Sequence, residues 1–188
     1  MIKSQIIILV VSLSLLFTIL SHCKTSDSPQ DIVKKYFTLD YEGERLSSRT
    51  AYRYEGLYAW EEEPGWDVVS VVRDFQIGKA TIKDSSATVE VVFSVFGQTG
   101  GGNWIPSGSS WGDNLPVIKQ SENIVFELRL IDNKWVIYRP NIRPHISLDA
   151  AIKHLQRNIE SYKKRSLPTE QINKTLNTLL KLKEVEKK

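Results

Sequence analysis

The chain has 188 residues, of which 41% are hydrophobic and 25% are charged, a composition typical of a globular protein and not of a disordered one. The formal net charge of +3 is too small to indicate nucleic-acid binding, so we expect no nucleic-acid partner. The single cysteine excludes an intramolecular disulfide and a metal site of the CxxC type.

The N-terminus predicts a secretory signal peptide over residues 1–22. Lys3 is followed by a run of fifteen uncharged, mostly apolar residues at positions 6–20. A helix of that length would rise roughly 22 Å, which is less than the ~30 Å hydrocarbon core of a bilayer, so a permanent transmembrane span is disfavoured. An uncleaved anchor, or a plain signal peptide with an incidental cysteine, is the alternative interpretation.

The apolar run ends in Leu-Ser-His-Cys at residues 20–23, which resembles the lipobox of bacterial lipoproteins. Leu20, Ser21 and Cys23 match that pattern, whereas His22 stands where the pattern has Gly, Ala or Ser. The resemblance implies that Cys23 is the lipid attachment site and the mature N-terminus, with residues 23–27 as the lipidated tether. Two or three acyl chains such as palmitate hold a protein durably on a membrane, so we expect a lipoprotein of the bacterial cell envelope that faces the non-cytoplasmic side.

A helix is predicted to begin at Ser28, because Ser is a preferred N-cap and Pro29 and Asp31 follow it at favourable positions. Helical spacing of apolar residues carries this helix to about Leu46, with Gly43 as a candidate interruption. The apolar face consists of Ile32, Val33, Tyr36, Phe37 and Leu39. Residues 47–66 are ambiguous, and a second helix is one interpretation.

From residue 68 the apolar pattern changes to a period of two, which predicts strands. One parity is shared by Val69, Val71, Phe75 and Ile77, and the other by Ala80 and Ile82. This slip across Gly78 indicates a β-bulge. A return strand through residues 89–95, a loop at 97–116 and a final pair of strands at 124–130 and 135–138 follow. Consecutive hairpins of this kind predict an antiparallel sheet.

The C-terminus predicts two short helices separated by a break at residues 166–169. We expect an antiparallel helical hairpin in which Leu155 and Ile159 face Leu176 and Leu179. Residues 150–188 hold ten Lys or Arg against four Glu, a local charge of +6. This basic surface has three interpretations: a solvated face, a contact with anionic lipid headgroups, or a docking site for a partner protein.

Three stretches resemble the nuclear-transport-factor-two-like superfamily, also called the SnoaL-like or cystatin-like cone: SPQDIVKKYFTLDYEGE, VVRDFQIGKATIKDSSATVEVVFSVF and FELRLIDNKWVIYRP. The resemblance covers residues 28–142 and implies an α+β fold in which a bent antiparallel sheet wraps on an N-terminal helix. We therefore expect a cone-like domain at residues 28–146 and a helical extension at 147–188. The superfamily includes isomerases, dehydratases, ligand binders and docking modules, so it does not fix the activity.

The cone resemblance implies a pocket between helix and sheet, although aromatic residues at these positions also suit a filled core. The candidate lining residues are Tyr36, Trp60, Trp66, Phe93 and Tyr138. Isomerases of the superfamily use an Asp base, for which Asp40, Asp67 and Asp74 are available, but none has a partner motif.

Arg139, Arg143 and His145 form a basic cluster that is a candidate anion site, with a solvated strand end as the alternative. After residue 22 only His145 and His154 remain, so we expect no metal and no other cofactor. The sequence favours a ligand-binding or protein-interaction module that recognises a protein partner or a small apolar ligand. An isomerase- or dehydratase-like enzyme is the alternative.

Overall fold

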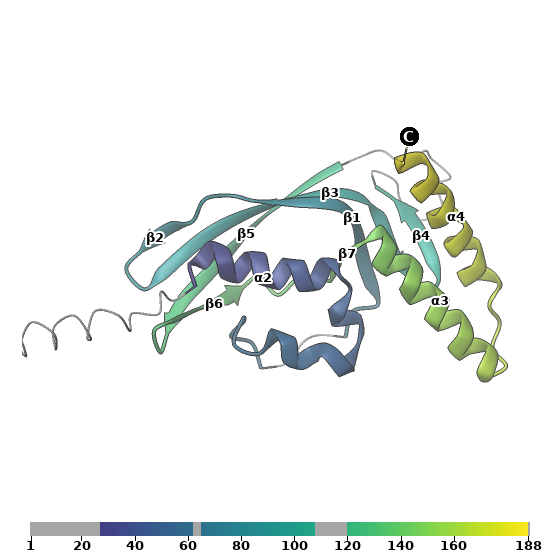
Figure 1. The fold of residues 1–188 in the computed structure, drawn as a ribbon, viewed down its shortest axis with the longest axis horizontal. Coiled ribbons are helices and arrows are strands. Elements are labelled where there is room, and N and C mark those ends of the chain that lie inside the picture. Colours follow the sequence, from purple (N-terminus) through teal and green to yellow (C-terminus); the bar gives the residue numbers. More distant parts are fainter. Residues whose placement is uncertain (1–26, 62–64, 108–119, 188) are drawn as a thin grey trace, which may run out of the picture.

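The computed structural model describes residues 27–61, 65–107 and 120–187, and within them the predicted α+β class is confirmed (Figure 1). Helices lie at both ends of the main described part of the chain, and a curved sheet lies between them. The helices are α2 (Pro29–Tyr41), α3 (Leu148–Lys164) and α4 (Glu170–Glu186), with two short 3-10 helices, η1 (Glu44–Leu46) and η2 (Ser48–Tyr54). The strands are β1 (Val68–Ile77), β2 (Thr81–Lys83), β3 (Ser86–Gly100), β4 (Asn103–Pro106), β5 (Gln120–Ile131), β6 (Lys134–Arg139) and β7 (His145–Ser147).

Helix α2 begins as predicted and ends earlier than predicted. The Ser28 hydroxyl accepts a hydrogen bond from the Asp31 backbone N–H, and the Asp31 carboxylate accepts one from the Ser28 backbone N–H, so the two residues form a capping box. The helix stops at Tyr41 and not near Leu46, because Gly43 adopts the left-handed conformation with φ of 80°. A Cβ at Gly43 would lie only 2.9 Å from the Cβ of Ala150, so α3 also requires a glycine here.

The sheet has the strand order β6-β5-β3-β1-β7, with β2 and β4 paired to the two ends of β3. The predicted antiparallel pairing holds for the hairpins, but the sheet is mixed because β7 runs parallel to β1. The predicted loop at residues 97–116 is wrong in its first part, where β3 continues to Gly100 and pairs with β4. Gly101 and Gly102, with φ of 56° and 82°, form the tight turn between them, and residues 108–119 lie outside the description.

Two irregularities bend the long hairpin of β1 and β3. Between the pairs Ile77↔Val91 and Thr81↔Thr88, the first strand advances four residues and the second only three. The extra residue opposite Glu90 confirms the predicted bulge at Gly78. A second irregularity at Val71 and Val72 was not predicted; it shifts the register by one residue in each direction.

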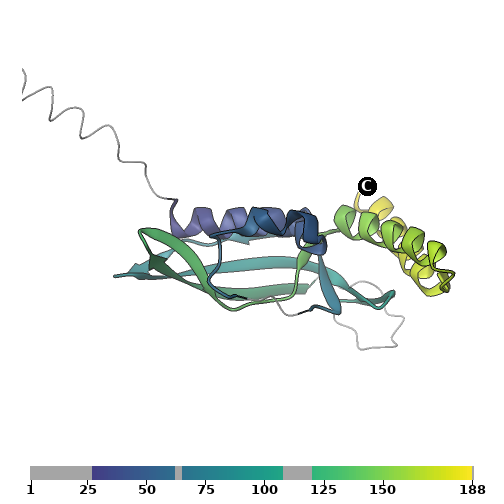
Figure 2. The same ribbon diagram turned by 90° about the horizontal axis from the view of Figure 1, so that it is seen from below.

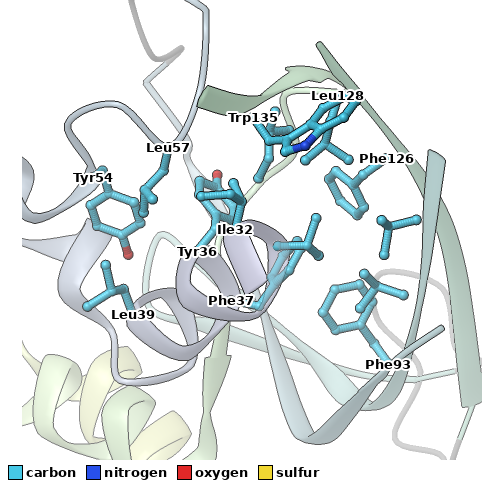
Figure 3. Packing of buried hydrophobic residues seen from close by; sticks show 14 of the residues in the cluster. Ile32, Tyr36, Phe37, Leu39, Tyr54, Leu57, Phe93, Phe126, Leu128 and Trp135 are labelled. Atoms are coloured by element: carbon cyan, nitrogen blue, oxygen red, sulfur yellow. The ribbon is translucent and has the colours of Figure 1, made fainter. Parts of the chain in front are cut away.

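The first core lies between α2 and the inner face of the curved sheet (Figure 2). Phe37 on α2 is fully buried, and its ring meets the rings of Phe93 and Phe126 at centroid distances of 5.1 and 5.0 Å. Figure 3 shows these three side chains pointing toward one another from α2, β3 and β5. Edge-to-face contacts of this kind fill the space under the helix.

The second core joins the end of the sheet to α3 and α4, which form the predicted hairpin. Leu155, Ile159 and Leu179 are buried there in one cluster, and Leu176 is partly buried beside them. The hairpin packs on the sheet as well as on itself, since the cluster also contains Val69, Val71, Phe96 and Ile146. Val71 belongs to this core and Phe75 packs against the first, although the two have the same parity in β1. The irregularity between them therefore changes the face on which residues of this parity lie.

The ambiguous stretch at residues 47–66 covers the edge of the sheet. After η2, the Ala59 N–H donates to the Ile137 carbonyl at 2.9 Å, and the Ile137 N–H donates to the Leu57 carbonyl at 2.8 Å. These bonds occupy the outer edge of β6, which would otherwise be an unpaired edge strand.

Candidate functional site

A cavity of about 400 Å³ lies where the second core meets the link after α2, and we call it the junction cavity. Five parts of the chain surround it: residues 45–48 after α2, residues 65–69 at the start of β1, the β3–β4 turn, Pro144 just before β7, and the inner side of α3. The lining residues are Arg45, Leu46, Ser47, Ser48, Gly65, Trp66, Asp67, Val69, Thr99, Gly100, Gly101, Gly102, Pro144, His154, Leu155 and Asn158.

The lining combines apolar and polar groups in nearly equal measure. Val69 and Leu155 are buried residues of the second core, and they give the cavity an apolar wall. Trp66 is 37% exposed and Asp67 beside it is exposed, so this pair lies at the open side. Such a cavity suits a ligand with both apolar and hydrogen-bonding surfaces.

Helix α3 contributes His154 and Asn158, which lie one turn apart and therefore on the same face. The Asn158 side-chain nitrogen lies 2.9 Å from His154 Nε2 and donates to it in the neutral form of the imidazole. Burial lowers the pKa of His154 below its usual 6.5, and nearby Arg157 lowers it further. The ring is therefore neutral at neutral pH, and its Nε2 accepts the hydrogen bond from Asn158 in the tautomer that is protonated on Nδ1.

Below the cavity lies a buried ion pair between Asp40 and Arg45. Arg45 Nη1 is 3.5 Å from the Asp40 carboxylate, and both side chains are almost fully buried. Arg45 Nη2 also donates to the Ile142 carbonyl at 2.9 Å, and the His145 backbone N–H donates to Asp40 at 2.7 Å. The pair thus fastens the end of α2 to the segment that leads into β7.

Sequence reasoning named Asp40 as a candidate acid and missed Arg45. The two residues are five positions apart across the end of a helix, a spacing that predicts no contact on a regular helix. Only the turn at Gly43 brings them together.

His145 lies in the interior, with its side chain 1% exposed and its ring centroid 4.3 Å from that of Phe93 in a tilted contact. Its Nδ1 donates to the Arg143 carbonyl at 2.8 Å. Its Nε2 is 3.5 Å from the Glu122 carboxylate, an ion-pair separation that is too long and poorly directed for a good hydrogen bond. His145 nevertheless is the main cause that holds the pKa of Glu122 below its usual value of 4.5.

The three residues of the predicted anion site have separate surroundings. Arg139 is exposed and pairs with Glu127 at 2.7 Å across β5 and β6, a contact that raises the pKa of Arg139. Arg143 is half-buried, and His145 faces the core. Among the residues described, these three side chains do not form a common anion-binding surface.

The five predicted pocket-lining aromatics also separate. Tyr36 and Phe93 are fully buried in the first core, where Trp60 meets Tyr36 edge-on at 6.2 Å. Trp66 lies at the junction cavity. Tyr138 is 39% exposed, with the Arg129 guanidinium 3.4 Å above its ring.

The remaining candidate acids lie apart from Asp40. Asp67 borders the junction cavity, and Asp74 is exposed and accepts a hydrogen bond from the Ser94 hydroxyl at 2.6 Å. Across residues 27–61, 65–107 and 120–187, no group of three or more His, Cys, Asp or Glu side chains is arranged to hold a metal ion.

No family model, no curated protein and no solved structure matches this chain. In the described part of the chain, no helix is both long enough and apolar enough to span a bilayer. Cys23, the predicted lipid attachment site, lies outside the described residues.

Proposed function

We propose that this protein is an exported lipoprotein, anchored to a membrane through Cys23, whose folded part is a binding module and not an enzyme. The observation that carries the binding half is the filled interior: aromatic side chains occupy the space between α2 and the sheet, and the junction cavity opens elsewhere. A reaction chamber enclosed by the cone would need that space.

The surroundings of Asp40 also favour binding over catalysis. An isomerase- or dehydratase-like mechanism needs a carboxylate that can reach a substrate proton. The Asp40 carboxylate is fully buried and already holds the His145 backbone N–H and the Arg45 side chain. We therefore assign Asp40 a structural role, and the enzyme remains the less supported alternative.

The positions of α2 and of the α3–α4 hairpin suit a module that is tethered through its N-terminus. Helix α2 begins at one end of the molecule, and the α3–α4 hairpin lies at the other (Figures 1 and 2). A short tether at residues 23–27 would keep Pro29 near the bilayer and hold the hairpin and the junction cavity away from it. The cavity would then be accessible to ligands of the surrounding compartment, and the basic hairpin would be remote from the headgroups of its own membrane.

Metabolic labelling with an alkyne-tagged fatty acid tests the anchor. We expect the wild-type chain and Ser21→Ala to be labelled and membrane-bound, because Ala at position 21 preserves the small residue of the lipobox. We expect Cys23→Ala to be unlabelled, because the thiol that accepts the diacylglyceryl group is gone. Equal labelling of Cys23→Ala would refute the anchor.

A further inference from the structure

We propose that the junction cavity is a binding site for a neutral, hydroxyl-rich ligand, namely a saccharide. This inference rests on the binding half of the proposed function and does not depend on the lipid anchor. It concerns a place outside the cone interior, formed by the end of the sheet and a helical hairpin.

The size and openness of the cavity suit one small ligand. Its volume of about 400 Å³ lies within the range of roughly 300 to 1,000 Å³ that is common for small-molecule sites. Gly101 forms part of one side, and a Cβ there would meet only the Asn103 side chain at 4.0 Å, so a ligand can approach the main chain at this glycine. The space beside Gly100 and Gly102 is instead occupied by Asp67, Val68 and Ile172.

The aromatic side chain at the opening favours a sugar ring. Trp66 borders the cavity and is 37% exposed, so part of its indole ring is accessible to a ligand. One face of a pyranose carries mainly C–H groups, and such a face packs well on the apolar face of an indole. Val69 and Leu155 extend the apolar contact inside the cavity.

The polar groups match hydroxyls, which both donate and accept hydrogen bonds. The Asp67 carboxylate is an acceptor, the Asn158 amide offers both functions, and the side chains of Ser47, Ser48 and Thr99 offer hydroxyls. Hydrogen-bond donors and acceptors therefore line the cavity together with the apolar wall.

The charge balance disfavours an anionic ligand. The Arg45 guanidinium lies in the lining, and the Asp40 carboxylate within 3.5 Å neutralises it. An incoming anion would therefore meet the Asp67 carboxylate without a compensating free charge. Asp67 is exposed, so water screens its attraction for a cation, and a neutral ligand can hydrogen-bond to the same carboxylate.

Isothermal titration calorimetry on the full-length chain tests the site, in a zwitterionic detergent without a sugar headgroup. The probes are cellobiose, maltose and N,N′-diacetylchitobiose, with tetramethylammonium chloride and sodium phosphate as ionic comparisons. We expect saturable binding of at least one disaccharide and none of the ions. We expect Trp66→Ala to weaken that binding at least tenfold.

Two matched variants sharpen the result. Tyr52→Ala removes an aromatic side chain that is 69% exposed and lies outside the cavity lining, so its affinity should equal that of the wild type. Asp67→Asn keeps a hydrogen-bond acceptor and removes the charge, so saccharide affinity should change less than tenfold. A cation site would instead lose its ligand in Asp67→Asn.

Three results would overturn the proposal: no binding of any disaccharide, undiminished binding by Trp66→Ala, or tighter binding of either ion. Circular dichroism of each variant establishes that a loss of binding is not a loss of folding. Fatty-acid labelling of Cys23 would be unaffected by any of these results, so the saccharide site and the lipid anchor can fail separately.

Discussion

The carboxylate of Asp40 accepts a hydrogen bond from the backbone N–H of His145 at 2.7 Å, although 105 residues separate the two in the sequence. Asp40 lies in the last turn of α2, and His145 is the first residue of β7. The bond therefore fixes the helix to β7, which pairs parallel to β1. Arg45 neutralises the carboxylate, which makes its complete burial tolerable.

Replacing Asp40 should test this connection directly. Asp40→Asn removes the charge that compensates the buried Arg45, and breaking a buried pair in this way typically costs about 3–5 kcal/mol. Asp74→Asn is the matched control, because Asp74 is exposed and should change the free energy of unfolding by no more than about 0.5 kcal/mol. Urea denaturation monitored by tryptophan fluorescence measures both. Equal stabilities for the two variants would contradict the structural role.

The filled interior predicts a large cost for removing an aromatic ring. Phe37→Ala should lower the free energy of unfolding by about 3–5 kcal/mol, because its fully buried ring packs against Phe93 and Phe126. Tyr52→Ala removes an exposed ring and should cost about 0.5 kcal/mol or less. A cost below about 1 kcal/mol for Phe37→Ala would indicate that the space under α2 is loosely packed.

Much of the fold follows from local patterns in the sequence. The N-cap at Ser28 and the two-residue period of the strands are short-range signals, and the structure contains the elements that they predict. The β-bulge at Gly78 could also be predicted from the sequence, because an extra residue reverses the parity of the apolar positions. The hairpin of α3 and α4 follows from two apolar stripes joined by a short break.

The features that sequence reasoning missed depend on contacts between distant segments. β7 has only three residues, too few for a periodic pattern, and its partner β1 lies over sixty residues away. The strand β4 follows a Gly-Gly turn that resembles an irregular loop in composition. The junction cavity is formed by five separate parts of the chain, so no single motif could have indicated it.

The hairpin provides a matched test in two adjacent leucines. Leu179 is fully buried in the second core, whereas Leu180 is 38% exposed on the other side of α4. Leu179→Ala should cost about 2–5 kcal/mol, and Leu180→Ala should cost clearly less. The comparison controls for helix propensity, because both variants make the same chemical change in the same helix. If Leu180→Ala lowered the free energy of unfolding more than Leu179→Ala, the assignment of the buried face of α4 would be wrong.

The pH dependence of stability offers a test of Glu122 and His145. The contact with His145 lowers the pKa of Glu122 in the folded protein below its usual value of 4.5. A carboxyl group whose pKa is lower in the folded than in the unfolded chain stabilises the fold above its unfolded pKa, and this stabilisation is lost as the pH falls through its folded pKa.

Glu122→Gln should therefore melt at a lower temperature than the wild type at those pH values above 4.5 at which His145 still carries its charge. The difference in melting temperature should shrink as the pH falls below that value, because the wild-type carboxyl group then becomes protonated and loses the same interaction. Glu55→Gln, which changes an exposed carboxylate after η2, should show no comparable pH-dependent difference. Thermal melts by circular dichroism over a series of pH values measure all three chains. A difference for Glu122→Gln that stays constant into acid would show that the substitution acts through packing, because a packing loss does not vanish when the carboxyl group takes up its proton.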